Sequence, residues 1–361
     1  MLLSLFLNQI FNFTMLLVSI FILLGGIILT FKTRFIQFRT IPEMFKLLVG
    51  NIFRKKKKTN KYETIAAHKA LFTAMSTSIG LGNIASPIIA IKLGGPGALL
   101  GFMLAAIFGS ASTFTEVTFA LKFRKKNPDG TISGGPMQYI KEALPPFFSS
   151  LYAYAGFVML TAWSGFQTNT LADLLQLRGV PPYITGIVLA IVISYILVGG
   201  IKRIGNFSAR LVPIMFLLYC TATLWIIISN LEKLPSIIDL IFRSAFTTKA
   251  IAGATVGYGL HQALRWGLTR GFFANESGLG TATIPHSMSA TKTPVNQGIL
   301  SMVSVYSNGF LCLLSGLVTL LTGTWMSTEK GLGIGINIIA KSFTMYFSTI
   351  GIVILMISAL L

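Results

Sequence analysis

The chain has 361 residues, of which 53% are hydrophobic and only 11% are charged. Soluble domains carry about 25% charged residues, and so few charges cannot cover the surface of a soluble protein of this size. The composition argues against a soluble enzyme, a disordered tail or a disulfide-rich secreted domain, and it indicates a polytopic membrane protein. The formal charge of +19 would suggest nucleic acid in a soluble protein, but here the basic residues lie between apolar stretches. We therefore expect no nucleic-acid partner.

Apolar stretches long enough to cross a lipid bilayer, about 20 residues each, recur along the chain. The first, 1–31, has no basic start and no small-residue cleavage site, so we interpret it as a retained helix and not as a signal peptide. Residues 32–63 are polar and basic, include the run Arg54 to Lys58, and predict a solvated cytoplasmic loop that contacts anionic lipid headgroups. Further spans are predicted at about 66–92, 98–121, 150–171, 182–199, 208–230, 250–270, 298–323 and 341–361.

The basic residues orient these nine predicted spans. If residues 32–63 are cytoplasmic, alternation of the spans also places 122–148, 200–207 and 271–297 inside. Of the 29 basic residues, 22 then lie on the cytoplasmic side or at the adjoining span ends, as the positive-inside rule requires. The sequence thus predicts an external N-terminus and a multi-pass protein of the cell inner (cytoplasmic) membrane.

The most informative stretch, 76–87, interrupts the second span with the helix breakers Gly80 and Gly82 and with polar side chains. Unsatisfied backbone in hydrocarbon costs several kcal/mol per group, so a break at this depth must be buried in protein or line a wet cavity. A glycine-rich packing face is the alternative, but the coincidence of breakers and polar groups favours a break. We expect Ser78 and Asn83 to face a substrate cavity; alternatively, they satisfy the backbone that the break sets free.

A second interrupted segment is predicted from 250 to 280, where Arg270 and Glu276 lie among glycines. An ionisable residue near membrane depth is a functional candidate by default, and an Arg270–Glu276 ion pair with a structural role is an equally supported alternative. Each interrupted span is the first span of one half of the chain, and the second half begins five spans after the first. Because five is an odd number, the two halves have opposite topology. This pattern indicates an inverted-repeat secondary transporter.

Backbone chemistry indicates what such breaks bind. Unwound helix ends leave N–H groups that attract a carboxylate, and freed carbonyls with nearby hydroxyls coordinate a small cation. We predict an anionic or zwitterionic substrate carried with Na⁺ or H⁺ as the coupling ion, and no other cofactor. The predicted substrate contacts are Ser78, Gly80, Gly82 and Asn83, and the predicted cation contacts are Thr77 and Gly80.

Glu116 lies on the third predicted span, within two turns of Lys122. Pairing or snorkelling at the cytoplasmic end is one interpretation, and a role in proton coupling is the other. We therefore place Glu116 with Arg270 and Glu276 in a group of structural or coupling residues.

Four motifs occur together along the chain: Gln37-Phe38-Arg39; Gly80-Leu-Gly-Asn83-Ile-Ala with Gly94-Gly-Pro-Gly-Ala98; Glu116 and Ala120-Leu-Lys-Phe-Arg124 with Gly134-Gly-Pro-Met137; and Arg270-Gly-Phe-Phe-Ala-Asn-Glu276-Ser-Gly-Leu-Gly-Thr-Ala282 with Pro285-His286. Together they resemble the alanine or glycine:cation symporters, also called the sodium:alanine symporter family. The resemblance implies an all-α, leucine-transporter-like inverted-repeat fold with an added N-terminal helix. It also implies symport of small neutral amino acids such as alanine and glycine, usually with Na⁺. For Asn275 it implies contact with the substrate or the cation.

The chain departs from the family pattern in three respects. It has Leu81 where the family usually has Thr, and Ser307-Asn308 where the next helix often has Asp-Thr. Family members also continue well past Leu361, so we expect a C-terminally shortened member whose second repeat is incomplete. The expected segments are an N-terminal transmembrane helix (1–31), a basic loop (32–65), a first five-helix repeat (66–230) and about three spans of the second (231–361). A truncated, non-transporting remnant is the alternative function; no enzyme motif is present, and we expect no enzyme.

Overall fold

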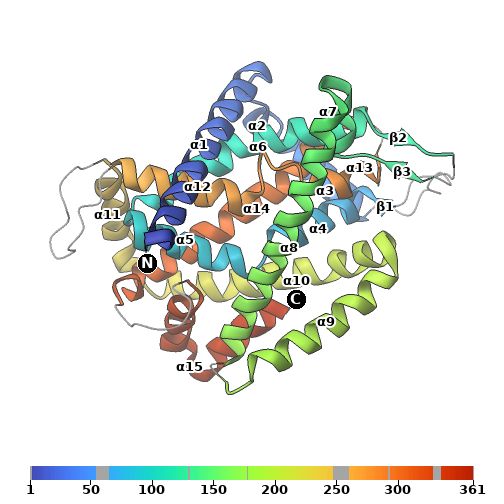
Figure 1. Ribbon diagram of the computed structural model, residues 1–361. Helices are drawn as coiled ribbons and strands as arrows, with labels where there is room; N and C mark the ends of the chain where they lie inside the picture. The colour runs from blue at the N-terminus through green and yellow to red at the C-terminus, as the bar shows by residue number, and fades with distance from the viewer. Residues whose placement is uncertain are drawn as a thin grey trace.

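The computed structural model of the protein is a bundle of α-helices with two short pairs of β-strands (Figure 1). It describes residues 2–53, 65–128, 131–176, 178–246, 260–291, 293–327 and 335–360. The basic run Arg54 to Lys58, predicted to contact lipid headgroups, lies outside the described residues.

The elements follow one another in a simple order. The helices are α1 (Leu2–Lys32), α2 (Ile36–Arg39), α3 (Ile41–Phe53), α4 (Ala67–Ser78), α5 (Leu81–Gly94), α6 (Ala98–Lys122), α7 (Pro136–Ala143), α8 (Pro146–Gln176), α9 (Pro182–Val198), α10 (Gly200–Ile228), α11 (Leu234–Phe246), α12 (Leu260–Asn275), α13 (Thr283–Ser287), α14 (Pro294–Leu321) and α15 (Ile336–Leu360). The short 3₁₀ helices are η1 (Leu231–Lys233) and η2 (Thr324–Met326). The strands are β1 (Ile65–Ala66), β2 (Lys125–Lys126), β3 (Ile132–Ser133) and β4 (Ser289–Ala290); β1 pairs with β4 in parallel, and β2 with β3 antiparallel.

The all-α polytopic class is confirmed, because five described helices are long and apolar enough to cross a membrane. The count becomes six if the bent pair α4–α5 is taken as one span. Every predicted span overlaps a helix, but α8 is not among these five helices, α9 has 17 residues and α12 has 16. The total of nine crossings therefore stays a prediction.

All four segments that we placed on the cytoplasmic side contain helices, among them α7 in 122–148 and α13 in 271–297. The helices α2 and α3 occupy much of the predicted loop 32–63, and α10 begins at Gly200, so that 200–207 is helical. On α3, Met44, Leu47 and Leu48 pack against the core at spacings of three and four, while Glu43 and Lys46 are exposed. This one-sided pattern of apolar residues is typical of an amphipathic helix, and a search for uniformly apolar spans overlooks it.

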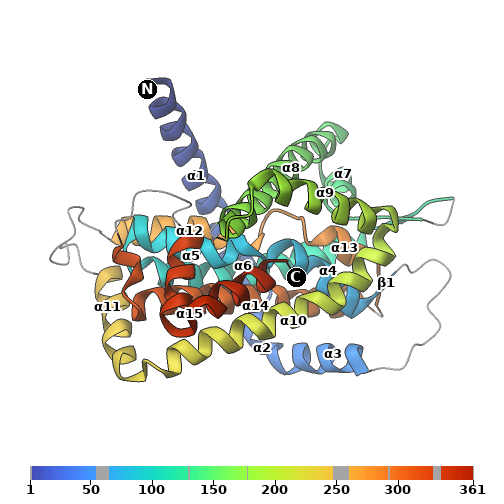
Figure 2. The same ribbon diagram turned by 90° about the horizontal axis from the view of Figure 1, so that it is seen from below.

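The predicted cytoplasmic segments lie at one end of the bundle. Figures 1 and 2 show β1, the β2–β3 hairpin and the α9–α10 junction together at this end, whereas α11 lies at the opposite end. We call the first the basic end. Arg265 and Arg270 are exceptions to the predicted charge distribution, because they lie on α12, whose first turns pack against Gly94 at the far end of α5.

The helix α6 lies at the centre of the bundle and packs along both α12 and α14. It approaches α12 closely at Gly101, where an added Cβ atom would lie 2.8 Å from the Cα atom of Gly267. Small residues allow this close approach between helices in a membrane. By contrast, α8 and α9 lie at the periphery of the bundle, and most of their apolar side chains are exposed. We expect lipid to cover those side chains.

Candidate functional site

The first predicted break is present between α4 and α5, whose axes bend by 46°. Gly80 has extended backbone with φ −165° and ψ −168°. In the last turn of α4, the Ser76 and Thr77 hydroxyls donate to the carbonyls of Thr73 and Ala74, each at 2.8 Å. Such back-bonding by Ser and Thr weakens and bends a helix. The break therefore lies in the middle of the predicted span, at the position that the glycines indicated.

The second break lies between α12 and α13, at 276–282, and is shorter than the predicted interruption. Residues 247–259 lie outside the described residues, and α12 continues without interruption through Arg265 and Arg270 as far as Asn275. The turn then passes through left-handed backbone at Glu276 (φ 51°), Gly278 (φ 84°) and Gly280 (φ 77°). The helix α12 thus ends at Asn275 and not at its internal glycines, which serve close packing on α6.

The two breaks meet inside the bundle, although they are far apart in sequence. The Thr77 hydroxyl, at the end of α4, shares its hydrogen between the Ala74 carbonyl and the Glu276 carboxylate, which lies 3.3 Å away, and the Thr281 hydroxyl donates to the same carboxylate oxygen. Glu276 is buried. A buried carboxylate is costly unless it is paired or hydrogen-bonded, and here hydroxyls from both broken helices supply that stabilisation.

Two asparagines form a second contact beside the first break. The Asn83 amide of α5 donates to the Ser78 carbonyl that the break sets free, and also to the Asn308 side-chain oxygen. The Asn308 amide of α14 in turn donates to the Ala274 carbonyl. Both side chains are buried. This network brings the amides of two asparagines together with backbone carbonyls from the ends of α4 and α12.

Asn275, the last residue of α12, is buried, and neither its amide nitrogen nor its amide oxygen has a hydrogen-bond partner among the described residues. A buried polar group without a partner costs about 1–3 kcal/mol. Because Asn275 directly precedes the turn at Glu276, its side chain is the group at this junction most in need of a ligand.

Sequence reasoning missed Gln167, a residue of α8. Its side-chain oxygen accepts a hydrogen bond from the Gly82 backbone N–H at 3.2 Å. An added Cβ atom at Gly80 would lie 3.0 Å from the Gln167 side-chain nitrogen. The signal that could have identified it was a pair of side-chain amides, Gln167 and Asn169, within the predicted span 150–171.

The other predicted residues lie around this junction without forming the predicted ion pairs. Among the described residues, Arg270 makes no ion pair with Glu276, and Glu116 makes none with Lys122. The Glu116 carboxyl group instead interacts with the backbone amides of the 278–280 segment. The Tyr152 hydroxyl of α8 supports the same turn by donating to the Leu279 carbonyl at 2.7 Å.

A sequence model of the sodium:alanine symporter family matches residues 2–361. The chain belongs to this family. The resemblance inferred from the four motifs is thereby confirmed, and the family is one of transporters.

Among individual members of the sodium:alanine symporter family, an uncharacterized transporter of Haemophilus influenzae is 37% identical to the chain over 311 residues, which cover 84% of the chain and 66% of that protein. A putative sodium/proton-dependent alanine carrier protein of Bacillus subtilis is 36% identical, over 85% of the chain and 62% of its own length. A sodium/alanine symporter of Methanococcus maripaludis is also 36% identical, over 84% of the chain and 67% of its own length. The matched part of the chain thus spans about two thirds of these relatives.

Proposed function

We propose that the protein is a secondary active transporter that couples the uptake of a small neutral amino acid, alanine or glycine, to Na⁺ across the cytoplasmic membrane. The observation that carries this proposal is the contact between the two breaks through Thr77 and Glu276. Broken helices that meet inside a bundle are the usual substrate and ion sites of secondary transporters. Relatives named as alanine carriers or sodium/alanine symporters support the substrate and the ion.

The groups beside the first break suit a small zwitterion. The N-terminus of α5 attracts a carboxylate, and the Gly82 N–H at this terminus is engaged by the side-chain oxygen of Gln167. We assign the substrate carboxylate to this helix end, where it would share or replace that contact. The unpartnered amide of Asn275 is assigned to the polar groups of the same substrate. Glycine at position 80 allows the Gln167 side chain to approach this helix end closely.

The coupling cation is assigned to the asparagine network. Hard cations prefer oxygen ligands from amides and backbone carbonyls, and the Ser78 and Ala274 carbonyls already converge on the Asn83 and Asn308 side chains. If the Asn83 amide alone turned over, its side-chain oxygen would face the Ser78 carbonyl and the Asn308 side-chain oxygen, and a cation could bind among these three oxygens. This assignment shifts the predicted cation site from Thr77 and Gly80 toward Asn83 and Asn308.

The direction of the broken helices supports the inverted-repeat interpretation. The helix α4 begins at the basic end, beside β1, and α5 continues toward the far end. The helix α12 begins where Gly94 ends α5, and α13 leads back to β4 at the basic end. The two broken helices therefore run antiparallel, as an inverted repeat requires.

The test is accumulation of labelled alanine in proteoliposomes that contain the purified chain. With an inward Na⁺ gradient and equal pH on both sides, we expect accumulation above the level in empty liposomes. We expect none with K⁺ in place of Na⁺ or with a proton gradient alone. The longer sodium/alanine symporter of M. maripaludis, reconstituted in parallel, is the positive control. If only the longer relative accumulates alanine, the chain is a non-transporting member and the proposal fails.

Binding of alanine to the detergent-solubilised chain tests the assigned substrate contact. Replacing Asn275 with alanine should weaken binding about tenfold, since a hydrogen bond to a buried or charged group contributes about 1.5–3 kcal/mol. Asn127→Ala is the matched control, because this exposed amide donates only to nearby Thr131 at 2.9 Å. Equal affinity for the two variants would remove Asn275 from the site.

A further inference from the structure

The cytoplasmic ends of the two broken helices are tied together by a short parallel ladder. The strand β1 directly precedes α4, and β4 lies two residues after the end of α13. Ile65 pairs with Ser289, and Ala66 pairs with Ala290. Because this ladder joins one broken helix to the other, α4 and α13 cannot separate at the basic end while it is intact.

Arg124 holds β4 in place from a third element. It lies just beyond the end of α6, and its guanidinium donates to the Ser287 carbonyl at 3.0 Å and to the Ser289 carbonyl at 2.9 Å. One cationic group thus bridges the last residue of α13 and the first residue of β4. Hydrogen bonds from a charged donor are stronger than those between neutral groups, so Arg124 is the strongest single tie at this position.

A buried residue of α14 makes a further tie. The Gln297 side-chain nitrogen contacts the Ala67 carbonyl at 3.3 Å and His286 Nδ1 at 2.7 Å. Gln297 and His286 are both fully buried. This side chain therefore links the first residue of α4 to α13.

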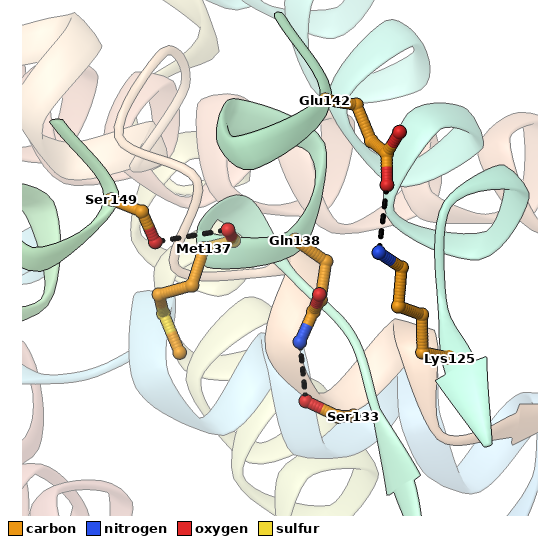
Figure 3. A network of polar contacts seen from close by, with 6 residues as sticks. All are labelled: Lys125, Ser133, Met137, Gln138, Glu142 and Ser149. Atoms are coloured by element: carbon orange, nitrogen blue, oxygen red, sulfur yellow. Dashed lines mark hydrogen bonds and ion pairs between the residues drawn. The ribbon is translucent and has the colours of Figure 1, made fainter. Parts of the chain in front are cut away.

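The neighbouring helix α7 has a separate set of contacts, which are shown in Figure 3. Lys125 pairs with Glu142 at 2.9 Å, and the Gln138 amide donates to the Ser133 hydroxyl at 2.7 Å. The Ser149 hydroxyl donates to the Met137 carbonyl at 3.0 Å. These bonds hold α7 to the β2–β3 hairpin and to α8, and none of them includes Arg124. They provide a control close to Arg124 in the chain.

A groove of about 950 Å³ opens beside the ladder. Lys46 and Asn51 of α3 line one side of the groove, and Ala290 of β4 and Gln297 of α14 line the other. The ladder therefore lies next to space that opens to the exterior of the bundle, and not deep within the core. Separation at this position would connect that space with the path between α4 and α13.

We propose that Arg124 is a positioning residue that keeps the basic end of the transport path closed by holding β4 against β1. The inference rests on the proposed function, because a transporter must open its site to each side of the membrane in turn. When the basic end opens, the guanidinium releases the two carbonyls, the ladder separates, and α4 moves away from α13. Arg124 acts through the ladder and does not contact the substrate.

Thiol accessibility tests this role without any transport measurement. A reporter cysteine, Ala70→Cys, replaces a fully buried residue on α4, and a membrane-impermeant maleimide is added to the basic side of inside-out vesicles. Cys220 and Cys312 are buried, and the chain without the reporter gives their background. Arg124→Gln should raise the labelling rate about tenfold, since it removes two charge-assisted hydrogen bonds.

Two variants make the labelling result specific. Arg124→Lys retains a cationic donor and should restore most of the slow labelling. Lys125→Gln breaks only the ion pair with Glu142 and should label like the parent chain. Labelling of the Arg124→Gln variant no faster than that of Lys125→Gln would overturn the proposal. Thermal unfolding in detergent shows whether the Arg124→Gln variant is folded.

An engineered disulfide gives a second test if the Arg124→Gln variant does not fold. Ala66 and Ala290 are register partners, and neighbouring strands are about 4.8 Å apart, within the range that a disulfide bridges. The oxidised Ala66→Cys/Ala290→Cys chain should bind external alanine but lose uptake, and reduction should restore uptake. Uptake at the full rate in the oxidised form would overturn the proposal that separation of β1 from β4 opens the basic end. If neither form takes up alanine while labelling still depends on Arg124, the proposed function fails, but the proposal that Arg124 keeps the basic end closed is retained.

Discussion

The two breaks interrupt helices inside the protein with different backbone conformations and different charge. The first break passes through extended backbone at Ile79 and Gly80, and its own residues 76–83 carry no charge. The second passes through left-handed backbone at Glu276, Gly278 and Gly280, and it carries a buried carboxylate. The first break therefore presents peptide groups that are hydrogen-bonded to side-chain amides, whereas the second is a compact turn organised around one charge.

The surroundings of the breaks reinforce this difference. The first break is approached mainly by side-chain amides, those of Gln167 and Asn83. The second is packed from several sides, since Gly278 contacts Ile22 of α1 and the Leu279 carbonyl accepts from Tyr152 of α8. We infer that the first break changes conformation when ligands bind, while the second break keeps its conformation.

The largest expected effect comes from removing the charge at the second break. Glu276→Ala removes the acceptor of both the Thr77 and Thr281 hydroxyls. A hydrogen bond to a charged group contributes about 1.5–3 kcal/mol, so alanine uptake should fall about 100-fold. Uptake is measured in proteoliposomes under an inward Na⁺ gradient.

Two variants define what the carboxylate of Glu276 contributes. Glu276→Gln keeps an acceptor oxygen and should recover uptake to within about tenfold of the parent chain, since neutral acceptors form weaker hydrogen bonds. Glu142→Ala removes an exposed carboxylate of the Lys125 ion pair and should leave uptake unchanged. If Glu276→Gln is as inactive as Glu276→Ala, the charge itself is essential and Glu276 becomes the candidate proton carrier.

A smaller effect is expected from the amides near the first break. Asn83→Ala and Asn308→Ala should each lower the apparent Na⁺ affinity about tenfold, because each removes one oxygen ligand from the assigned cation site. The double variant should lose less than the product of the two, since residues in one network are not additive. The measurement is the Na⁺ dependence of alanine binding.

Asn230→Ala is the matched control for these two variants. Asn230 is also buried, but its amide donates to the Ile226 carbonyl and the Tyr346 hydroxyl, remote from either break. It should reduce stability without changing Na⁺ affinity. Additive losses in the Asn83/Asn308 pair, or an equal loss in Asn230→Ala, would argue against a shared cation site.

The sequence allowed the first break to be predicted in place, because helix breakers and polar residues coincide there within an apolar span. The second break was predicted only within a long segment, since Gly267 and Gly271 look like interruptions. In the structure these glycines lie within α12 and face α6, at Gly101 and Ala105. A glycine that permits close packing and one that permits a turn are alike in a single sequence.

The contacts between breaks were beyond the reach of local patterns. Thr77 and Glu276 are 199 positions apart, and Asn83 and Asn308 are 225 positions apart. Asn308 was noted only as a departure from the family pattern, and nothing in its own neighbourhood points to Asn83. Such contacts depend on how α4, α5, α12 and α14 pack, which hydropathy and spacing do not specify.

The smallest expected effect is a difference in stability between two glycine-to-alanine substitutions. Gly278 has left-handed backbone with φ 84°, and an added Cβ atom would lie 3.0 Å from Ile22. Gly278→Ala should therefore destabilise the fold by about 1 kcal/mol, the approximate cost of an L-residue in this conformation. Gly80 has extended backbone, and an added Cβ atom would meet only the flexible end of Gln167. Gly80→Ala should leave the unfolding temperature nearly unchanged and weaken alanine binding instead. Thermal unfolding and alanine binding, measured on both variants in the same detergent, separate the two effects. Equal destabilisation by both substitutions would show that the first break is as rigid as the second.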